Sequence, residues 1–221
     1  MYSKTSNIPT DLAHFATRSD RANYLVDKFG KLLVGNVLDV GCDMRLLRKL
    51  LPPEVAYTGI DIGGDPDIQI DLEKIDRLPF DDAAFECVVC TDVLEHIDNL
   101  HHVFAELARV SSRYIIISLP NNWVNARLPV ARGRGHIGFY GLPVNKPVDR
   151  HKWFFSLSEA REFFEGQADS MSLNIVEMLA VDKPRPPVLR SLLRLFTPSK
   201  ERYLNRYAHT LWAIFEKKTA V

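Results

Sequence analysis

The stretch Val37-Leu38-Asp39-Val40-Gly41-Cys42-Asp43 indicates the fold of this chain. A short run of β-branched and apolar residues reaches an aspartate and a glycine, which is the pattern of a buried strand that ends in a tight turn. A second run of this kind, Tyr57 to Ile62, ends in Ile60-Asp61-Ile62. Between the two runs, the spacing predicts a helix from Arg45 to Leu51, which two consecutive prolines end.

The alternation of strands and helices continues along the chain. Apolar runs predict further strands over residues 67–72, 85–91, 114–119, 173–181 and 209–216. Amphipathic spacing predicts helices over 18–33 and 99–110, and the capping box Ser156-Leu157-Ser158-Glu159 predicts another through Phe164. This order favours a doubly wound, mostly parallel α/β sheet.

Length and charge are consistent with one globular domain over residues 1–221. Lys plus Arg equals Asp plus Glu at 28 each, which argues against a generally basic nucleic-acid coat. The charges are separated, however. Residues 39–106 carry 16 acidic and 5 basic side chains, a net charge of −11, whereas 127–152 carry +5 and 183–206 carry +6.

Neither a membrane span nor a disulfide framework is predicted. Apolar runs fall far short of the roughly 20 residues that a spanning helix needs, so we expect a cytoplasmic protein, with peripheral membrane contact as an open alternative. Cys87 and Cys90 form a C-x-x-C pattern on a predicted strand, where positions i and i+3 face opposite sides of the sheet. We therefore expect neither a redox pair nor a metal site there.

Ligands of open parallel sheets bind at the carboxyl ends of the strands. There the blocks V-L-D-V-G-C, G-I-D-I and L-P-F-D-D-A-A-F-E-C-V-V-C-T-D-V-L-E-H-I, within Val37 to Asn121, resemble the class I S-adenosylmethionine-dependent methyltransferases. The resemblance implies a seven-stranded Rossmann-like sheet with helices on both faces, a C-terminal antiparallel edge strand, and a cofactor-binding core over 36–120. It also implies S-adenosyl-L-methionine as cofactor.

The same resemblance implies the cofactor-binding residues. Asp39 and Gly41 lie against the methionine part, and those around the ribose, adenine and floor are Asp61, Ile62, Asp71, Leu72 and Thr91. Cys42, in the glycine turn, is a further cofactor-binding candidate. One departure concerns the glycine turn, usually G-x-G-x-G, which here reads Gly41-Cys42-Asp43-Met44-Arg45. If the positions of the two replaced glycines require positive φ, Asp43 is tolerable there and Arg45 is strained. We favour the alternative that a helix begins at Met44 with Asp43 as its N-cap, which requires no unusual backbone conformation.

An acceptor hydroxyl must lose its proton when it is methylated. The catalytic candidates are His151, His96 and Tyr140, with His136, Asp92 and Glu95 as further possible bases. Asp92-x-x-Glu95-His96 with a distant histidine resembles magnesium-assisted small-RNA 2′-hydroxyl and ubiquinone-type methyltransferases. We favour the alternative that this block has only the structural role that is common among these methyltransferases, so no metal is predicted.

Residues 121–152 are predicted to form an irregular, basic acceptor loop, since loops of this length are usually functional. The expected reaction is O-methylation of a small or lipid-linked metabolite, without sequence-specific nucleic-acid binding. A non-catalytic binding module with lost cofactor affinity and an RNA methyltransferase stay as alternatives. The acceptor and the oligomeric state cannot be read from the residues.

A basic amphipathic insertion is predicted over 182–208. Within it, residues 187–196 place Arg190 and Arg194 on one helical face and apolar residues, Leu189, Leu192, Leu193 and Phe196, on the other. This pattern is typical of a short interfacial helix that touches a membrane. The competing interpretation, which we favour slightly, is a lid whose leucines pack on the protein's own core.

Overall fold

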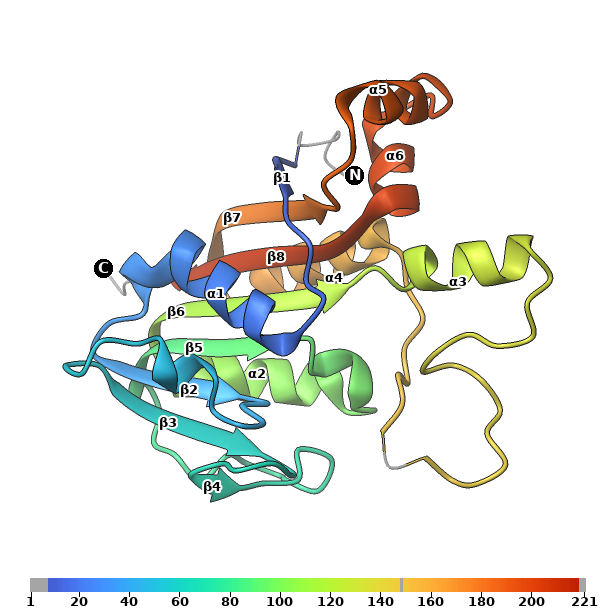
Figure 1. Cartoon of the computed structure of the whole chain (residues 1–221). Coiled ribbons are helices and arrows are strands. Elements are labelled where there is room, and N and C mark those ends of the chain that lie inside the picture. The colour runs from blue at the N-terminus through green and yellow to red at the C-terminus, as the bar shows by residue number, and fades with distance from the viewer. Residues whose placement is uncertain (1–7, 148, 219–221) are drawn as a thin grey trace.

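The computed structural model describes residues 8–147 and 149–218, so the ends of the predicted domain 1–221 lie outside the described residues. The described chain forms one sheet with the strand order β1-β7-β8-β6-β5-β2-β3-β4 (Figure 1). The strands are β1 (Thr10–Leu12), β2 (Asn36–Val40), β3 (Ala56–Asp61), β4 (Ile68–Gln69), β5 (Phe85–Thr91), β6 (Ser111–Pro120), β7 (Leu173–Asp182) and β8 (Ala208–Lys217).

Helices cover both faces of this sheet. The described helices are α1 (Arg18–Phe29), α2 (Leu100–Val110), α3 (Asn122–Ala131), α4 (Leu157–Ser170), α5 (Pro187–Leu195) and α6 (Lys200–Tyr207), of which α3 and α5 extend beyond the sheet (Figure 1). α1 packs its buried Leu25 and Phe29 on one face, whereas α2 and α4 pack Phe104 and Phe164 on the other (Figure 1). Burial on both faces explains why the central strands are almost continuously apolar.

The fold class is confirmed, with two differences in the sheet. Within the described residues it has eight strands rather than seven, because Thr10–Leu12 adds a parallel edge strand beside β7. The antiparallel strand β8 lies between β6 and β7 and is therefore interior, not the predicted edge. The N-terminal strand is only three residues long, too short to give a periodic signal.

Three local predictions were wrong. The helix expected over Arg45–Leu51 is a series of turns with one 3-10 turn at Leu47–Lys49. The strand expected over 67–72 extends only over Ile68–Gln69. The loop expected over 121–152 begins with helix α3, and Nδ2 of Asn121, just before this helix, donates to the backbone oxygens of Leu204, Asn205 and Ala208.

The cysteine prediction is confirmed. Cys87 packs in the cluster that contains α1, and Cys90 packs in the cluster that contains α2 and α4, so the two thiols lie on opposite faces. In the described part of the chain, no helix is long and apolar enough to cross a membrane.

Candidate active site

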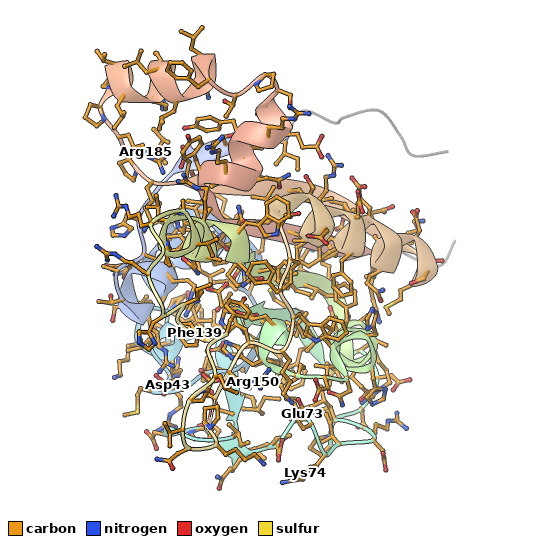
Figure 2. All side chains as sticks on the ribbon, turned by 90° about the vertical axis from the view of Figure 1, so that its right-hand side faces the viewer. Asp43, Glu73, Lys74, Phe139, Arg150 and Arg185 are labelled. Atoms are coloured by element: carbon orange, nitrogen blue, oxygen red, sulfur yellow. The ribbon has the colours of Figure 1, made fainter. Side chains whose placement is uncertain are left out.

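The carboxyl ends of β2, β3 and β5 meet at one edge of the sheet, where the predicted cofactor residues gather. Figure 2 looks onto this edge, with Asp43, Phe139 and Arg150 labelled. After β2, Gly41 adopts a φ of 79°, and a Cβ there would lie 2.2 Å from Cγ2 of Val93. Only glycine fits this turn, which brings backbone close to whatever binds above it.

The turn after Gly41 corrects our favoured interpretation. Asp43 and Arg45 both have positive φ, 47° and 52°, so neither is part of a helix that starts at Met44. They occupy the backbone conformation that glycines would adopt, and side-chain contacts hold them there. Arg18 lies 2.5 Å from the Asp43 carboxylate, and Arg45 pairs with two aspartates, Asp65 and Asp67.

Asp61, at the end of β3, joins the loops that follow β2 and β3. One carboxylate oxygen accepts from the backbone N–H of Asp43 at 2.8 Å, and the other accepts from that of Gly63 at 3.1 Å. Each oxygen retains a lone pair, so the group can also accept from ribose hydroxyls. Ile62 beside it is 62% exposed, which leaves its side chain free to cover a flat ring.

Asp39 is a buried carboxylate at the end of β2. Its Oδ2 accepts from the hydroxyl of Tyr57 at 2.8 Å. Burial raises the pKa of Asp39 to about 6, and the nearby carboxylate of Asp61 adds to the increase. A cationic group bound beside Asp39 would offset this burial cost, so the site fits the ammonium group of a methionine-type cofactor.

The remaining predicted cofactor residues lie at the same edge. Asp71 is paired with Lys74 at 2.7 Å, and this contact lowers the pKa of the Asp71 carboxyl. Leu72 and Cys42 are buried, and Thr91 ends β5. The positions of these residues are consistent with the predicted roles, and the roles themselves stay predictions.

A second cluster lies just past β5. Glu95 and His96, in the 3-10 turn Leu94–His96, lie with His151 so that one ligand-type atom of each is within 4.8 Å of the others. Glu95 is 1% exposed, and its Oε2 has no hydrogen-bond partner among the described residues. Burial raises the pKa of this carboxyl well above its ordinary value. An unpaired buried carboxylate oxygen is costly and points to a missing partner.

The segment after the long loop carries His151 into the cluster. The backbone N–H of Lys152 donates to the carbonyl of Glu95 at 2.8 Å, and Nε1 of Trp153 donates to the carbonyl of Ile97 at 2.7 Å. Lys152 also pairs with Glu73, which Figure 2 labels below the loop. These contacts place side chains 55 residues apart in sequence against each other.

Three side chains orient the imidazole of His151. Its Nδ1 lies 2.7 Å from the hydroxyl of Tyr140 and 3.1 Å from Nδ2 of Asn122, and the ring of Phe139 stacks on it at 4.7 Å. Phe139 does so at a φ of 66°, which is unusual for a bulky residue and is often found at functional sites. Burial, and then the His96 imidazole, lowers the pKa of His151 to about 4.

The structure separates two other candidates from this cluster. Asp92 pairs with Arg21 of α1 and accepts from Ser118 Oγ at 2.6 Å, and it lies outside the group that Glu95, His96 and His151 form. His136 is exposed in the loop. Instead, Asp149 lies 2.6 Å from Nδ1 of His96. Asn122 was not among the predicted site residues, although two consecutive asparagines directly after β6 were a signal for it.

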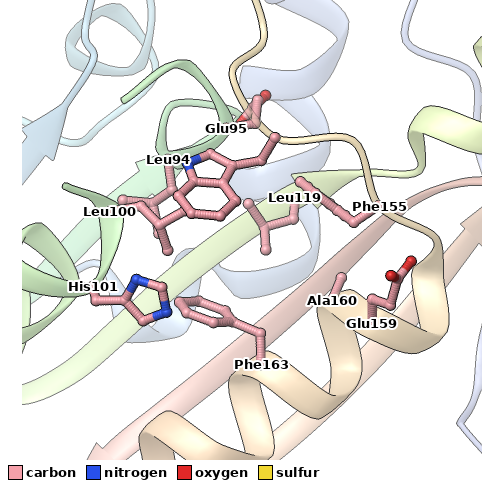
Figure 3. Close-up of a pocket in the computed structure, with 10 residues that line it drawn as sticks. Leu94, Glu95, Leu100, His101, Leu119, Phe155, Glu159, Ala160 and Phe163 are labelled. Atoms are coloured by element: carbon pink, nitrogen blue, oxygen red, sulfur yellow. The ribbon is translucent and has the colours of Figure 1, made fainter. Parts of the chain in front are cut away.

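An apolar cavity adjoins the cluster. It has a volume of about 180 Å³ and lies between α2, α4 and the segment 153–155 that precedes α4, with Glu95 on its wall (Figure 3). Its lining is mostly apolar and aromatic: Leu94, Leu100, Leu119, Trp153, Phe155 and Phe163. The space suits a ring or a short branched hydrocarbon group, since an apolar cavity of roughly 150 Å³ binds benzene.

An α/β sheet with this glycine turn, strand-end carboxylates at one edge and an adjoining apolar cavity is consistent with the class of S-adenosylmethionine-dependent transferases of one-carbon groups. The family described as "Methyltransferase domain" matches residues 13–167, and the chain belongs to this family. S-adenosylmethionine is the family's cofactor, and the fit at Asp39, Gly41 and Asp61 agrees with it.

Individual relatives are more distant. A ubiquinone biosynthesis O-methyltransferase from Photobacterium profundum is 30% identical over 105 residues, 41% of this chain and 45% of that protein. The chain spans about half the length of the curated relatives it matches. Among solved structures, a SAM-dependent methyltransferase from Archaeoglobus fulgidus has a TM-score of 0.57 at 15% identity and covers 90% of this chain and 94% of its own. The small RNA methyltransferase HEN1 has a TM-score of 0.57 at 16% sequence identity, and the match covers 97% of this chain and 27% of HEN1.

Proposed function

We propose that this protein is an O-methyltransferase that transfers the methyl group of S-adenosylmethionine to a hydroxyl of a small or lipid-linked metabolite. The observation that carries the proposal is the Glu95, His96 and His151 cluster, which follows a cofactor-edge strand and includes an unpaired buried carboxylate oxygen. The name of the curated relatives, ubiquinone biosynthesis O-methyltransferase, supports a hydroxyl acceptor.

The residues of this chain supply position and proton acceptance. Methyl transfer from a sulfonium is an in-line displacement, so holding the acceptor oxygen in line with the methyl group is a large part of catalysis. His151 is neutral at pH 7 because its pKa is lowered to about 4, and Glu95 is a desolvated carboxyl. Either can accept a hydrogen bond from a hydroxyl that enters between them.

The cluster also fits a divalent cation. Its donor set is one carboxyl and two imidazoles, which suits manganese and related ions, and a cation would bind the free Oε2 of Glu95 with loss of the proton that burial favours on this group. Such a cation supplies Lewis acidity toward the acceptor hydroxyl. This arrangement favours the metal alternative over a purely structural role for the Asp-x-x-Glu-His block.

Tyr140 controls which nitrogen of His151 is available. Nδ2 of Asn122 can only donate, so while it is bonded to Nδ1 the neutral ring carries its proton on Nε2. In the other tautomer, the protonated Nδ1 donates to the hydroxyl oxygen of Tyr140. The Tyr140 hydroxyl in turn donates to the carbonyl oxygen of Trp153, with 3.3 Å between the two oxygens. Nε2 then has a free lone pair. Tyr140→Phe is therefore expected to weaken cation binding roughly tenfold or more.

The cavity beside Glu95 supports an acceptor with an apolar group. About 180 Å³ accommodates an aromatic ring or a single branched five-carbon unit, not a long chain. A hydroxylated ring with an apolar substituent would place the ring or the substituent in this space while its hydroxyl stays near Glu95.

The test combines cofactor binding, turnover and metal dependence. Labelled S-adenosylmethionine is supplied with prenylated catechols, and turnover is measured with chelator and after manganese or magnesium is restored. We expect activity that is lost with chelator, returns with the metal, and falls at least about a hundredfold in His151→Ala. His102→Ala, an exposed histidine on α2, is the matched control. Cofactor binding without methylation of any hydroxylated acceptor would contradict the proposal.

RNA is the second candidate acceptor. The loop around His151 carries exposed arginines, Arg132, Arg134 and Arg150, which suit phosphate contacts. Binding of single-stranded RNA that weakens steeply with salt, together with methylation of a ribose hydroxyl, would favour this candidate over the metabolite. A non-catalytic module is tested by the same cofactor titration, because it would bind neither S-adenosylmethionine nor its product.

A further inference from the structure

Helix α5 (Pro187–Leu195) leaves its apolar side chains in solvent. It lies at the top of Figure 1, beyond the end of β7 and far from β3 and β4. Within the described part of the chain, none of its residues is buried. Val188 is 73% exposed, Leu195 77% and the following Phe196 75%, and Leu189 and Leu192 are nearly half exposed. These five residues are called the α5 apolar stripe.

The stripe lies on one face of the helix. Val188, Leu192 and Leu195 follow i, i+4 and i+7 spacing, and the other two residues flank them. Leu193, at the margin of the stripe, is partly buried and packs against the core cluster that contains α2 and α4. The favoured lid interpretation, in which these leucines pack on the protein's own core, is therefore wrong for every predicted apolar position except Leu193.

Charge indicates what covers the stripe. Residues 183–206, which contain α5 and most of α6, carry seven basic side chains and one acidic side chain. Residues 39–106, at the opposite end of the sheet, carry a net charge of −11. Figure 2 shows Arg185 near the base of α5 and Glu73 toward the other end of the molecule. A negatively charged surface would attract the α5 end and repel the other, so the molecule would approach it in one orientation.

We propose that the α5 apolar stripe is a docking surface for an anionic lipid bilayer. The five apolar side chains enter the boundary between headgroups and acyl chains, and the surrounding lysines and arginines contact lipid phosphates. One short helix buries little apolar area, so binding requires both contributions. This inference rests on α5 and its charge alone, and it is independent of the proposed methyl acceptor.

The first experiment removes the apolar contribution. Full-length protein is floated with vesicles of phosphatidylcholine and phosphatidylglycerol at about 0.1 M salt. Leu192→Asp with Leu195→Asp is expected to lower the bound-to-free ratio roughly tenfold or more, because two side chains no longer enter the bilayer. Val34→Asp, an exposed apolar residue before β2, is the matched control and should bind as wild type. Melting curves and cofactor titrations verify that each variant is folded.

The second experiment removes the charge contribution. Arg190→Gln with Arg202→Gln should weaken binding to anionic vesicles and leave the weak binding to pure phosphatidylcholine unchanged. Binding of wild type should also decline at about 0.5 M salt. Three results would overturn the proposal: wild type that stays unbound at low salt, the double aspartate variant binding like wild type, or a stable dimer that the same variant converts to monomer. The last result would show that a second copy covers the stripe.

Discussion

Asp39→Asn is expected to stabilise the free protein while it weakens cofactor binding. Asp39 is 6% exposed, and its pKa is raised to about 6 from an ordinary value of 3.8, mainly by burial. A raised carboxyl pKa means that folding disfavours the charged form. Below about pH 4 the group is protonated in both states and has no effect; between pH 4 and 6 the unfolded chain ionises first, so stability falls as pH rises.

The magnitude follows from the difference in pKa. A difference of about two units corresponds to about 3 kcal/mol, which is fully present above pH 6. Asparagine carries no charge and can still accept from the hydroxyl of Tyr57, so the variant avoids this cost. The effect on cofactor binding is expected to be opposite to the effect on stability. The variant lacks a charged partner for the ammonium group of S-adenosylmethionine, so its affinity for the cofactor should be at least about tenfold weaker.

The assay is urea denaturation of wild type and variant from pH 4 to 8, followed by calorimetric titration with the cofactor. The variant should gain stability over wild type as pH rises from 4 to 6, and the gain should stay constant above that. A stability difference that is independent of pH, or unchanged cofactor affinity, would refute the reasoning.

Three further outcomes are expected. Asp61→Ala should weaken S-adenosylmethionine binding roughly tenfold to a hundredfold in calorimetry, and wild-type affinity would contradict the ribose role. Gly41→Ala should lower the melting temperature by roughly 5 °C or more, because its Cβ would meet Val93 at 2.2 Å, whereas Gly63→Ala, with open space around it, should not. Thiol reagents should label the three buried cysteines, Cys42, Cys87 and Cys90, only after the protein unfolds. Rapid labelling of the native protein would disprove their burial.

Much of the fold could be predicted because strands buried on both faces carry a strong apolar signal. The strands at β2, β3, β5 and β6 were all located from such runs. The helix over 45–51 was wrong because apolar spacing alone cannot separate a helix from turns that pack two leucines. α3 was missed because Pro129 inside it argues against a helix, and because its packing on α6 involves residues distant in sequence that no local pattern encodes.

The cofactor edge and the acceptor cluster differ in how far the residues reveal them. Asp39, Gly41 and Asp61 end neighbouring strands, and parallel topology alone brings such ends together. His151 is different: it reaches Glu95 only because Lys152 and Trp153 bond to backbone at the end of β5. The conformations of Asp43 and Arg45 likewise depend on ion pairs with distant residues.

The residues alone therefore predict the α/β class, the positions of its central strands along the chain and the sheet edge at which the candidate cofactor residues gather, because these depend on local periodicity and on the topology of parallel sheets. Only the folded structure decides that β8 is interior, that Glu95, His96 and His151 form one cluster, and that the α5 apolar stripe faces solvent. Each of these depends on which surfaces meet in space. A helical wheel shows that a helix has an apolar face, but burial depends on what the rest of the chain packs against it.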